Sequence, residues 1–474
     1  MAGQADIAMI GVGVMGSNLA LNMAEQGATV ALYDIDASKA QALADENFPG
    51  KLIPCASLEE LVAAARAPRP FVMLAPAGEI VDQLIGEMTA LIDAGDILID
   101  AGNSNFRDTR RRTAEVEAKG FAFLGMGVSG GAEGARHGPA LMAGGSRGVW
   151  DRVAPVFEKV AAQYRDTPCA AWLGADGAGH FVKTVHNGIE YALMQMIAEC
   201  YGMMRDGFGM AAPEIGEVFA DWNKGALDCY LVDITAKALL SKDAETGAPM
   251  VDVILDRAGQ KGTGRWTAIE AQWLGMPLTT VEAALIGRSL SARRDERMTM
   301  EKVYGPAPQR IADDGLDPKV MLREALIAGK IIAYSQGFAL LDAASKEFEW
   351  DVKLVDVAKV WRAGCIIRSR LLNEMATALE MERVTTGSAM PLLLREPFVG
   401  MMKTADPSLR GAVATSAVYG LPAPALSAAL TWFDLARTGH STANMIQAQR
   451  DFFGAHGFER MDREGGGFHG NWTA

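Results

Sequence analysis

Residues 7–16, Ile-Ala-Met-Ile-Gly-Val-Gly-Val-Met-Gly, decide how the first part of this chain folds. Ile7–Ile10 is a short apolar run of the kind that a parallel sheet buries on both faces. In the G-x-G-x-x-G pattern that follows, Gly11 permits a tight turn, Gly13 lets the backbone approach a pyrophosphate, and Gly16 lets the next helix pack closely on the strand. The N-terminus of that helix offers unpaired N–H groups and partial positive charge to an anion. The stretch predicts a dinucleotide-binding strand, turn and helix.

The same alternation continues outward from this stretch. Short apolar runs and amphipathic patterns predict strands at Ala28–Tyr33, Phe71–Ala75 and Ile97–Asp100 and helices at Ser17–Gln26, Ala37–Asn47 and Val81–Ala94. A strand at Phe121–Gly127 leads into a Gly-rich segment, and a further αβ unit extends to about Gly174. This repetition predicts a doubly wound, Rossmann-type α/β domain over residues 1–178.

The character of the chain changes after this unit. Residues 179–440 are long helical patterns rich in Ala, Leu, Met and Glu, with breaks at Ala211-Ala212-Pro213 and Gly305-Pro306. They predict a large all-helical domain. Residues 441–474 contain Gly465-Gly466-Gly467, which does not sit stably in a helix, and they predict an extended C-terminal tail.

Composition excludes several classes of protein. The chain has 474 residues, 49% of them hydrophobic and 22% charged, which is typical of packed domains and not of a disordered chain. Its net charge of −13 excludes the basic footprint of a nucleic-acid-binding protein. That charge still allows an anionic substrate, which needs only a local cluster of cations.

Cysteine usage and hydropathy bear on cellular location. The five cysteines lie far apart without a CxxC pair, so neither a disulfide framework nor a zinc site is predicted, and no metal is expected. The N-terminus has no basic region, and no apolar run approaches the roughly 18 residues that span a bilayer. We therefore expect a cytoplasmic protein that binds neither a membrane nor nucleic acid.

The acid at the end of the second strand bears on the choice of cofactor. Asp34 follows Gly11 by 23 residues, where a carboxylate accepts hydrogen bonds from the adenosine ribose hydroxyls of NAD. Its charge, with that of Asp36, repels the 2′-phosphate of NADP, and the nearest cation is Lys39. The pattern favours NAD, with NADP as the alternative. The predicted cofactor-binding residues are Gly11, Val12, Gly13, Val14, Met15, Gly16, Asp34, Ile35 and Asn103.

Four polar residues share one face of a predicted helix. They are Lys183, His186, Asn187 and Glu190, spaced i, i+3, i+4 and i+7. Such a stripe is often a solvated face. The alternative is an inward face on which Lys183 and Glu190 act as a base and an acid on one substrate.

Three other stretches favour the inward face. Asp100–Ser104 sits at the carboxyl end of a predicted strand, where open α/β sheets bind ligands. Val128–Gly131 offers consecutive backbone N–H groups suited to a carboxylate. Lys261–Trp266 combines a cation with two glycines in the helical region, where glycine is costly unless the backbone must approach a ligand.

Together these motifs resemble those of 6-phosphogluconate dehydrogenase, and the resemblance runs over essentially the whole chain. Ordered motifs in both predicted domains and in the tail make a chance likeness negligible. The resemblance is carried by Gly102-Asn103-Ser104, Gly127-Val128-Ser129-Gly130-Gly131, Phe181-Val182-Lys183, His186-Asn187-Gly188-Ile189-Glu190-Tyr191, Gln260-Lys261-Gly262-Thr263-Gly264-Arg265-Trp266 and Gln447-Ala448-Gln449-Arg450-Asp451-Phe452-Phe453-Gly454-Ala455-His456.

The resemblance implies oxidative decarboxylation of 6-phospho-D-gluconate to D-ribulose 5-phosphate and CO2, a step of the pentose phosphate pathway. Lys183 would take the proton of the C3 hydroxyl while hydride passes from C3 to the nicotinamide. It would return a proton to the carbonyl oxygen as CO2 leaves, and Glu190 would then protonate C1 of the enediol. No metal is implied, because the ammonium group stabilises the enediolate charge.

The resemblance also implies contacts to substrate and to a second subunit. Tyr191, Lys261 and Arg288 match contacts to the phosphate end. Arg450 and His456 match tail residues that complete the site of the other subunit, so a homodimer with shared active sites is expected. The residues that match contacts to the sugar acid are Asn103, Ser129, Gly130, Gly131, His186 and Asn187.

The chain departs from the family pattern near the cofactor. NADP-linked members carry Asn-Arg-Thr where this chain has Asp34-Ile35-Asp36, and Pro76 stands where the family usually places a Lys. Both changes remove positive charge and favour NAD.

Two other functions compete with the implied one. A β-hydroxyacid dehydrogenase acting on a smaller acid is disfavoured by the size of the helical region and by its predicted phosphate-binding cations. A non-catalytic cofactor-binding protein is disfavoured by the presence of both Lys183 and Glu190.

Overall fold

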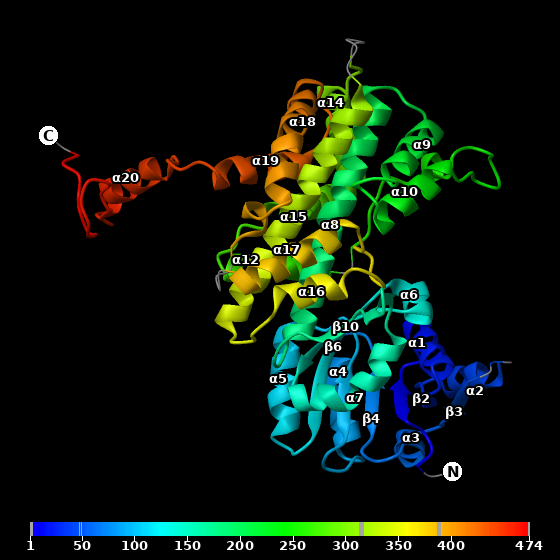
Figure 1. Cartoon of the computed structure of the whole chain (residues 1–474). Coiled ribbons are helices and arrows are strands. Elements are labelled where there is room, and N and C mark those ends of the chain that lie inside the picture. The colour runs from blue at the N-terminus through cyan, green and yellow to red at the C-terminus, as the bar shows by residue number, and fades with distance from the viewer. Residues whose placement is uncertain are drawn as a thin grey trace.

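The computed structural model describes residues 3–46, 48, 50–260, 262–311, 317–385 and 390–472. Figure 1 shows a sheet-containing N-terminal part in blue and cyan, a helical part in green to orange, and a red C-terminal arm that reaches away from both. The predicted fold class is confirmed, since a Rossmann-type α/β sheet is followed by a large helical region.

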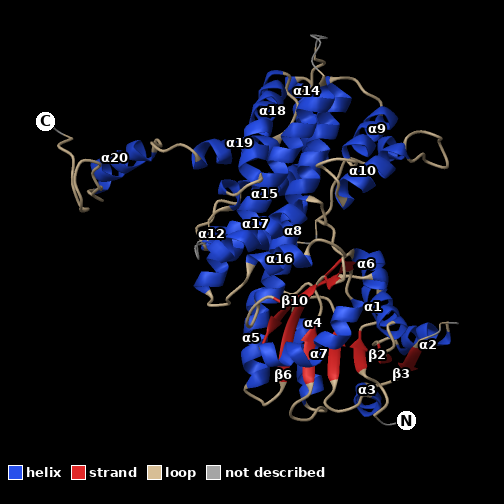
Figure 2. Ribbon diagram, in the orientation of Figure 1, coloured by secondary structure: helices blue, strands red, loops and turns tan. Residues whose placement is uncertain are grey.

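An eight-stranded sheet forms the centre of the first part (Figure 2). Neighbouring strands are parallel except for β6 and β7. Because β1 pairs with both β2 and β4, the strand order reverses at its carboxyl end, where such sheets bind ligands. The strands are β1 (Ile7–Ile10), β2 (Thr29–Tyr33), β3 (Lys51–Pro54), β4 (Pro70–Met73), β5 (Ile97–Asp100), β6 (Ala122–Ser129), β7 (Ala140–Gly145) and β10 (Ala170–Trp172), in the order β10-β7-β6-β5-β4-β1-β2-β3.

Helices cover both faces of the sheet, each face with its own apolar core. Side chains of α1 (Val14–Glu25) and α7 (Arg147–Val160) fill one core. Side chains of α3 (Leu58–Ala64), α4 (Glu79–Thr89) and α5 (Phe106–Glu117) fill the other. Also in this part are α2 (Ala37–Asp45), α6 (Gly131–His137) and the two short strands β8 (Gln163–Tyr164) and β9 (Thr167–Pro168).

Most of the predicted strands are confirmed, but the sheet is larger than predicted. The runs that begin at Ile7, Ala28, Phe71 and Ile97 form β1, β2, β4 and β5, and the run from Phe121 extends to Ser129 as β6. The prediction missed β3, an edge strand that contains a lysine and a proline, and β7, which is rich in Ala and Gly. Neither has the β-branched content on which strand prediction depends. β7 also runs antiparallel to β6, a departure from a wholly parallel sheet.

The helical part begins with α8 (Ala178–Gly202), which packs beside α15 (Pro318–Glu347) at its centre (Figure 1). The predicted breaks are confirmed, since α9 begins at Ala212 and α14 ends at Tyr304. The other elements are η1 (Met203–Gly207), α9 (Ala212–Trp222), α10 (Tyr230–Leu240), α11 (Met250–Val253), α12 (Thr263–Trp273), α13 (Thr279–Ser291), α14 (Arg294–Tyr304), α16 (Leu354–Val360), α17 (Leu371–Thr385), η2 (Leu392–Leu394), α18 (Phe398–Val418) and α19 (Pro424–Ala436).

α8 meets the sheet over glycines of β6 and β7, which we call the glycine floor (Gly125, Gly127 and Gly144). A Cβ added to Gly127 would overlap the Cβ of Lys183 and lie 2.9 Å from its Cγ. A Cβ added to Gly179 of α8 would lie 2.6 Å from the Gly125 carbonyl oxygen and 2.5 Å from the Gly144 amide nitrogen. These distances leave no room for a methyl group, so glycine on both sides is what allows the helix and the strands to lie this close.

The C-terminal arm is more ordered than the extended tail that the sequence predicts. Ala443–Gly454 forms helix α20, and the following residues fold back through pairing of Phe458 with Phe468. The buried carboxylate of Asp451 organises this fold, because it accepts hydrogen bonds from the amides of Gly457 and Gly470 and from the Trp472 indole. The prediction of an extended tail depended on Gly465-Gly466-Gly467. These glycines lie after α20, so they do not prevent Ala443–Gly454 from forming a helix.

Replacing Gly127 with alanine should destabilise the protein. The added methyl group would push α8 off the sheet, and overpacking of this kind costs about 1–3 kcal/mol of unfolding free energy. A denaturant titration followed by circular dichroism should show a lower midpoint for Gly127→Ala than for the wild type.

Gly86→Ala is the matched control for this substitution. Gly86 lies in α4 with nothing within 4 Å of an added Cβ, so alanine there should raise the stability by up to about 1 kcal/mol. Equal midpoints for the two variants would contradict the close packing of α8 on the glycine floor.

Candidate active site

The turn between β1 and α1 is shaped for an anion. Gly11 has a φ of 95°, and Gly16 lies so close to it that a Cβ there would overlap the Gly11 carbonyl oxygen. Gly13, the N-cap of α1, has nothing within 4 Å of an added Cβ and no capping side chain. The amide groups at this helix end therefore face open space, where a pyrophosphate fits.

Asp34 lies at the end of β2 and is tied to this turn. Its Oδ2 accepts a hydrogen bond from the Val12 amide at 2.8 Å, and its Oδ1 accepts one from the Asp36 amide at 3.0 Å. The Lys39 ammonium lies 3.4 Å from the same Oδ1. Asp34 is buried, whereas the neighbouring Ile35 is 95% exposed and offers no polar group. The predicted adenosine site therefore has two carboxylates, Asp34 and Asp36, and one nearby lysine, which leaves it with a net negative charge.

Hydrogen bonds to the Asp100 side chain hold the loop that follows β5. This buried carboxylate accepts hydrogen bonds from the Gly102 amide at 3.1 Å and from the Ser104 hydroxyl at 2.6 Å. Arg112 of α5, also buried, lies 3.4 Å from the same carboxylate. Asn103 stands exposed at the tip of this anchored loop, at the carboxyl edge of the sheet.

The polar face of α8 is turned inward, so the solvated-face interpretation is wrong. Lys183, His186 and Asn187 are all buried, and the Glu190 side chain is 22% exposed. His186 connects the group: its Nδ1 lies 3.4 Å from the Lys183 Nζ and 3.9 Å from a Glu190 oxygen, and its Nε2 lies 3.1 Å from the Ser129 hydroxyl. The Asn187 side-chain oxygen also lies 3.1 Å from His186 Nδ1, so the structure brings five of the predicted site residues into one connected cluster.

Burial sets the protonation of this cluster. Removal from water lowers the pKa of Lys183 to about 8, although the opposite charge of Glu190 acts against the shift. Burial raises the pKa of Glu190, with the charges of Lys183 and Arg288 opposing it. Burial and the Lys183 charge hold the pKa of His186 well below its usual range, so its ring is neutral. The face thus pairs a lysine that loses its proton more readily than an ordinary lysine with a carboxyl group that keeps its proton more readily than an ordinary glutamate.

The predicted phosphate end also comes together from three helices. The Arg288 guanidinium of α13 lies 3.5 Å from the centre of the Tyr191 ring of α8. Gly264 of α12 packs so close to that ring that a Cβ there would lie 2.6 Å from it. Lys261, the third predicted contact, lies outside the described residues.

Other predicted residues lie at the turn after β6 or far from it. Gly130 and Gly131 lead from β6 into α6, both with positive φ. Arg450 and His456 are exposed on the arm, which Figure 1 shows standing away from α8. Within a single chain the structure does not bring them to Lys183.

Sequence reasoning missed the segment 361–365 behind the cluster. The Trp361 ring lies edge-on to the His186 ring with centroids 5.8 Å apart. A Cβ added to Gly130 would lie 2.5 Å from the Gly364 carbonyl oxygen, too close for a side chain. Cys365 is buried near Lys183, and burial raises its thiol pKa to about 12. No motif marks this segment, because it acts through packing.

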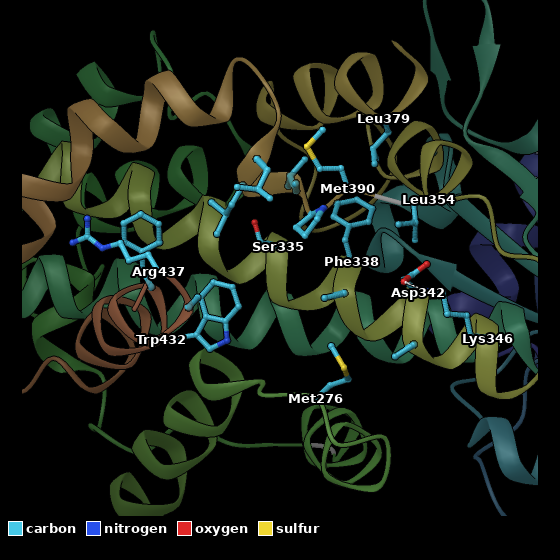
Figure 3. A pocket seen from close by; sticks show the side chains of 18 residues that line it. Met276, Ser335, Phe338, Asp342, Lys346, Leu354, Leu379, Met390, Trp432 and Arg437 are labelled. Atoms are coloured by element: carbon cyan, nitrogen blue, oxygen red, sulfur yellow. Dashed lines mark hydrogen bonds and ion pairs between the residues drawn. The ribbon is translucent and has the colours of Figure 1, made fainter. Parts of the chain in front are cut away.

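A separate cavity of about 600 Å³ lies in the helical part (Figure 3). Its lining is mostly apolar and includes Ser335 and Phe338 of α15 and Trp432 of α19. None of the predicted site residues that the structure describes lines it. Within the described ranges, no group of three or more His, Cys, Asp or Glu side chains is placed to hold a metal ion. Among the same residues, none of the helices combines the length and apolar character needed to traverse a bilayer.

Both parts of the chain match known family models. Residues 6–174 match the NAD binding domain of 6-phosphogluconate dehydrogenase, and residues 179–472 match the C-terminal domain of the same enzyme.

Individual relatives match over nearly their full length. Two Bacillus subtilis proteins are each 42% identical to 98% of this chain: a 6-phosphogluconate dehydrogenase described as NADP(+)-dependent, covered over 98% of its length, and one described as NAD(+)-dependent, covered over 99%. The solved structure of Plasmodium falciparum 6-phosphogluconate dehydrogenase, studied in its apo form, with its cofactor NADP+ and with its substrate 6-phosphogluconate, aligns with a TM-score of 0.94. It is 37% identical and covers 98% of this chain and all of its own.

The amine of Lys183 should lose its proton at a far lower pH than an ordinary lysine. Labelling with an amine-acylating reagent, read by peptide mass spectrometry across pH, should give a midpoint of about 8 for Lys183. In Glu190→Gln the midpoint should fall further, because removing the opposite charge destabilises the ammonium form.

Lys237 provides an internal control in the same labelling experiment. It is exposed on α10, and its hydrogen bond to Asp233 raises its pKa above the ordinary 10.5. Coincident midpoints for Lys183 and Lys237 would show that burial does not control the Lys183 amine.

Proposed function

This chain belongs to the 6-phosphogluconate dehydrogenase family, and we infer that it converts 6-phospho-D-gluconate to D-ribulose 5-phosphate and CO2 while reducing a nicotinamide cofactor. The observation that carries this inference is the connected cluster of Lys183, His186 and Glu190 on α8, beside the Tyr191–Arg288 pair. The family match over residues 179–472 disfavours a dehydrogenase for a smaller acid, and the connected acid and base disfavour a non-catalytic protein.

The turn at Gly13 fits a dinucleotide, because an added Cβ there would point into open space that a pyrophosphate can occupy. Residues 11–16 would hold the pyrophosphate, and Asp34 would hold the adenosine ribose. When bound, the nicotinamide accepts the hydride that leaves C3 of the substrate.

Lys183 is proposed to act as base and then as acid. In its neutral form it takes the proton of the C3 hydroxyl as the C3–H bond breaks, and a 3-keto acid results. As the bond from C2 to the carboxylate breaks and CO2 leaves, the lysine returns that proton to the C3 carbonyl oxygen, which yields the enediol. A pKa of about 8 lets one amine serve both steps near neutral pH.

Glu190 is proposed to complete the reaction by giving a proton to C1 of the enediol, the carbon numbered by the pentose product. Neutral Lys183 takes the proton of the C2 hydroxyl in the same step, so that the C2 ketone of the product forms. Burial raises the pKa of Glu190, which favours its protonated form. Neutral His186, together with Asn103, Ser129, Asn187 and the Gly130-Gly131 backbone, would hydrogen-bond the sugar acid, while Tyr191, Lys261 and Arg288 would hold the phosphate.

The active unit is proposed to be a homodimer in which Arg450 and His456 complete the site of the partner. The arm that carries them stands away from its own α8 (Figure 1). Its helix also exposes apolar side chains, with Met445 at 62%, Phe452 at 63% and Phe453 at 73%. Exposed apolar groups on a projecting element are typical of a surface that another chain covers.

NAD is proposed as the preferred cofactor. Relatives of both kinds exist, so the choice depends on the residues of this chain. A 2′-phosphate would meet the carboxylates of Asp34 and Asp36, and exposed Ile35 supplies no cation in place of the arginine of NADP-linked members. Lys39 lies beside Asp34 and offsets only part of this charge.

Initial-rate kinetics on 6-phosphogluconate with each cofactor test both the activity and this preference. A difference of about 2 kcal/mol in transition-state binding corresponds to a kcat/KM roughly thirtyfold higher with NAD than with NADP. Asp34→Asn combined with Ile35→Arg should shift the ratio towards NADP, because it removes a negative charge and adds a positive one.

Two controls accompany these measurements. Lys183→Met should lower kcat by at least about a hundredfold, as expected for loss of a general base. Lys39→Met should leave the NAD rate unchanged. A wild-type preference for NADP that disappears in Lys39→Met would overturn the assignment and identify Lys39 as the phosphate partner.

Subunit complementation tests the shared site. Lys183→Met and Arg450→Ala should each be nearly inactive alone. A mixed dimer has one complete site, formed by the intact Lys183 of one subunit and the intact arm of the other. Mixing equal amounts after dissociation and reassociation should therefore restore about a quarter of wild-type activity.

Arg460→Ala is the matched control on the arm, since Arg460 pairs with Asp462 and lies outside the motif. It should remain fully active alone. If no activity returns when Lys183→Met and Arg450→Ala subunits exchange, each arm serves its own subunit or none, and the shared site is rejected.

A further inference from the structure

Helices α5, α8 and α12 lie together beside the active site, and α8 packs against each of the other two. On the α5 side, Phe106 packs edge-on against Phe181 with ring centroids 4.9 Å apart. On the α12 side, the Thr267 hydroxyl donates a hydrogen bond to the Thr184 carbonyl at 2.7 Å, one residue beyond Lys183. A Cβ on Gly188 would lie 2.6 Å from Thr267, so this contact is close as well.

The contact between α5 and α12 is an ion pair between residues 163 positions apart in the chain. The Arg107 guanidinium donates two parallel hydrogen bonds to the Glu270 carboxylate, at 2.8 Å from Nε and 2.7 Å from Nη2. The Glu270 side chain is 5% exposed and that of Arg107 is 50% exposed. A buried carboxylate needs such a partner, and the planar fork of arginine restricts its orientation.

Each partner stands next to a functional segment. Arg107 is in the first turn of α5, and its amide donates a hydrogen bond to the Asn105 side chain. Asn105 ends the loop that bears Asn103, residues 101–105, which we call the cofactor loop. Glu270 lies on the helix whose first turn, residues 262–265, packs on Tyr191 through Gly264. The ion pair thus spans the gap between the cofactor loop and the predicted phosphate end.

The two segments are not equally well anchored. The cofactor loop is held independently by Asp100 and by the buried Phe106. The first turn of α12 has a left-handed Gly262 as N-cap and no side-chain cap, and the Thr267 hydrogen bond that joins α12 to α8 lies one turn beyond it. Loss of the ion pair should therefore displace the first turn of α12 more than the cofactor loop.

We propose that Arg107 and Glu270 are a positioning pair that holds the first turn of α12, and with it the phosphate end of the substrate site, against the cofactor loop. The proposal deepens the proposed function and rests on it. Neither residue touches substrate; the pair acts through Gly264 and Tyr191. The expected signature is weaker substrate binding with cofactor binding nearly unchanged.

Steady-state kinetics on full-length Arg107→Met and Glu270→Gln test this role. Each variant should raise the KM for 6-phosphogluconate about tenfold, since small misplacements of binding groups cost factors of this size. The KM for NAD should change less than about twofold. Because the two residues act as one unit, the KM for 6-phosphogluconate should be no higher in the double variant than in the worse single variant.

Arg69→Met is the control for general loss of stability. Arg69 forms a similar pair with buried Asp96 at the amino ends of β4 and β5, opposite the active site. This variant should unfold at a lower temperature and keep the wild-type KM. Glu270→Gln removes the buried charge instead of stranding it, so it keeps the test available if Arg107→Met does not fold.

Three results would overturn the positioning role: substrate KM values within twofold of wild type, single effects that multiply in the double variant, or lower kcat with unchanged KM. Failure of the proposed function has a different signature. In that case the wild type itself would not turn over 6-phosphogluconate with NAD or NADP.

Discussion

The contact between α8 and the glycine floor is the constraint on which the rest of the site depends. It carries Lys183 from the helical part of the chain onto β6, within reach of Ser129 through His186. The same contact removes the lysine amine from water, which lowers its pKa, while burial raises the pKa of Glu190 two turns along the helix. One packing feature therefore sets both the position and the protonation of the proposed base and acid.

Local charge around α8 differs from the charge of the whole molecule. The chain carries a net charge of −13, yet Lys183 and Arg288 line the face that would receive a sugar acid with both a carboxylate and a phosphate. Arg288 lies over the Tyr191 ring, so its charge is held in place by an aromatic contact. In a site of low dielectric such cations act more strongly than surface ones, and a few suffice against a negative background.

The connections around the site are made by residues that share no motif. Arg107 and Glu270 join α5 to α12, Asp100 supports the cofactor loop, and residues 361–365 close the cluster from behind. In the arm, Asp451 has the same kind of structural role, because one buried carboxylate gathers the amides that fold the end of the chain onto α20. The predicted ligand-binding groups thus depend on a second set of residues for their positions.

Local patterns by themselves determined the strands β1, β2, β4, β5 and β6, the phosphate-binding turn, and the spacing that puts Lys183 and Glu190 on one face. Each of these depends on residues within a few positions of one another. They did not determine whether that face is buried, that β7 runs antiparallel, or that Arg107 pairs with Glu270. Only the tertiary structure decided these, because burial and contacts between distant segments come from the packing of the whole chain. Periodicity can show which residues share a face, but it contains no term for what covers that face.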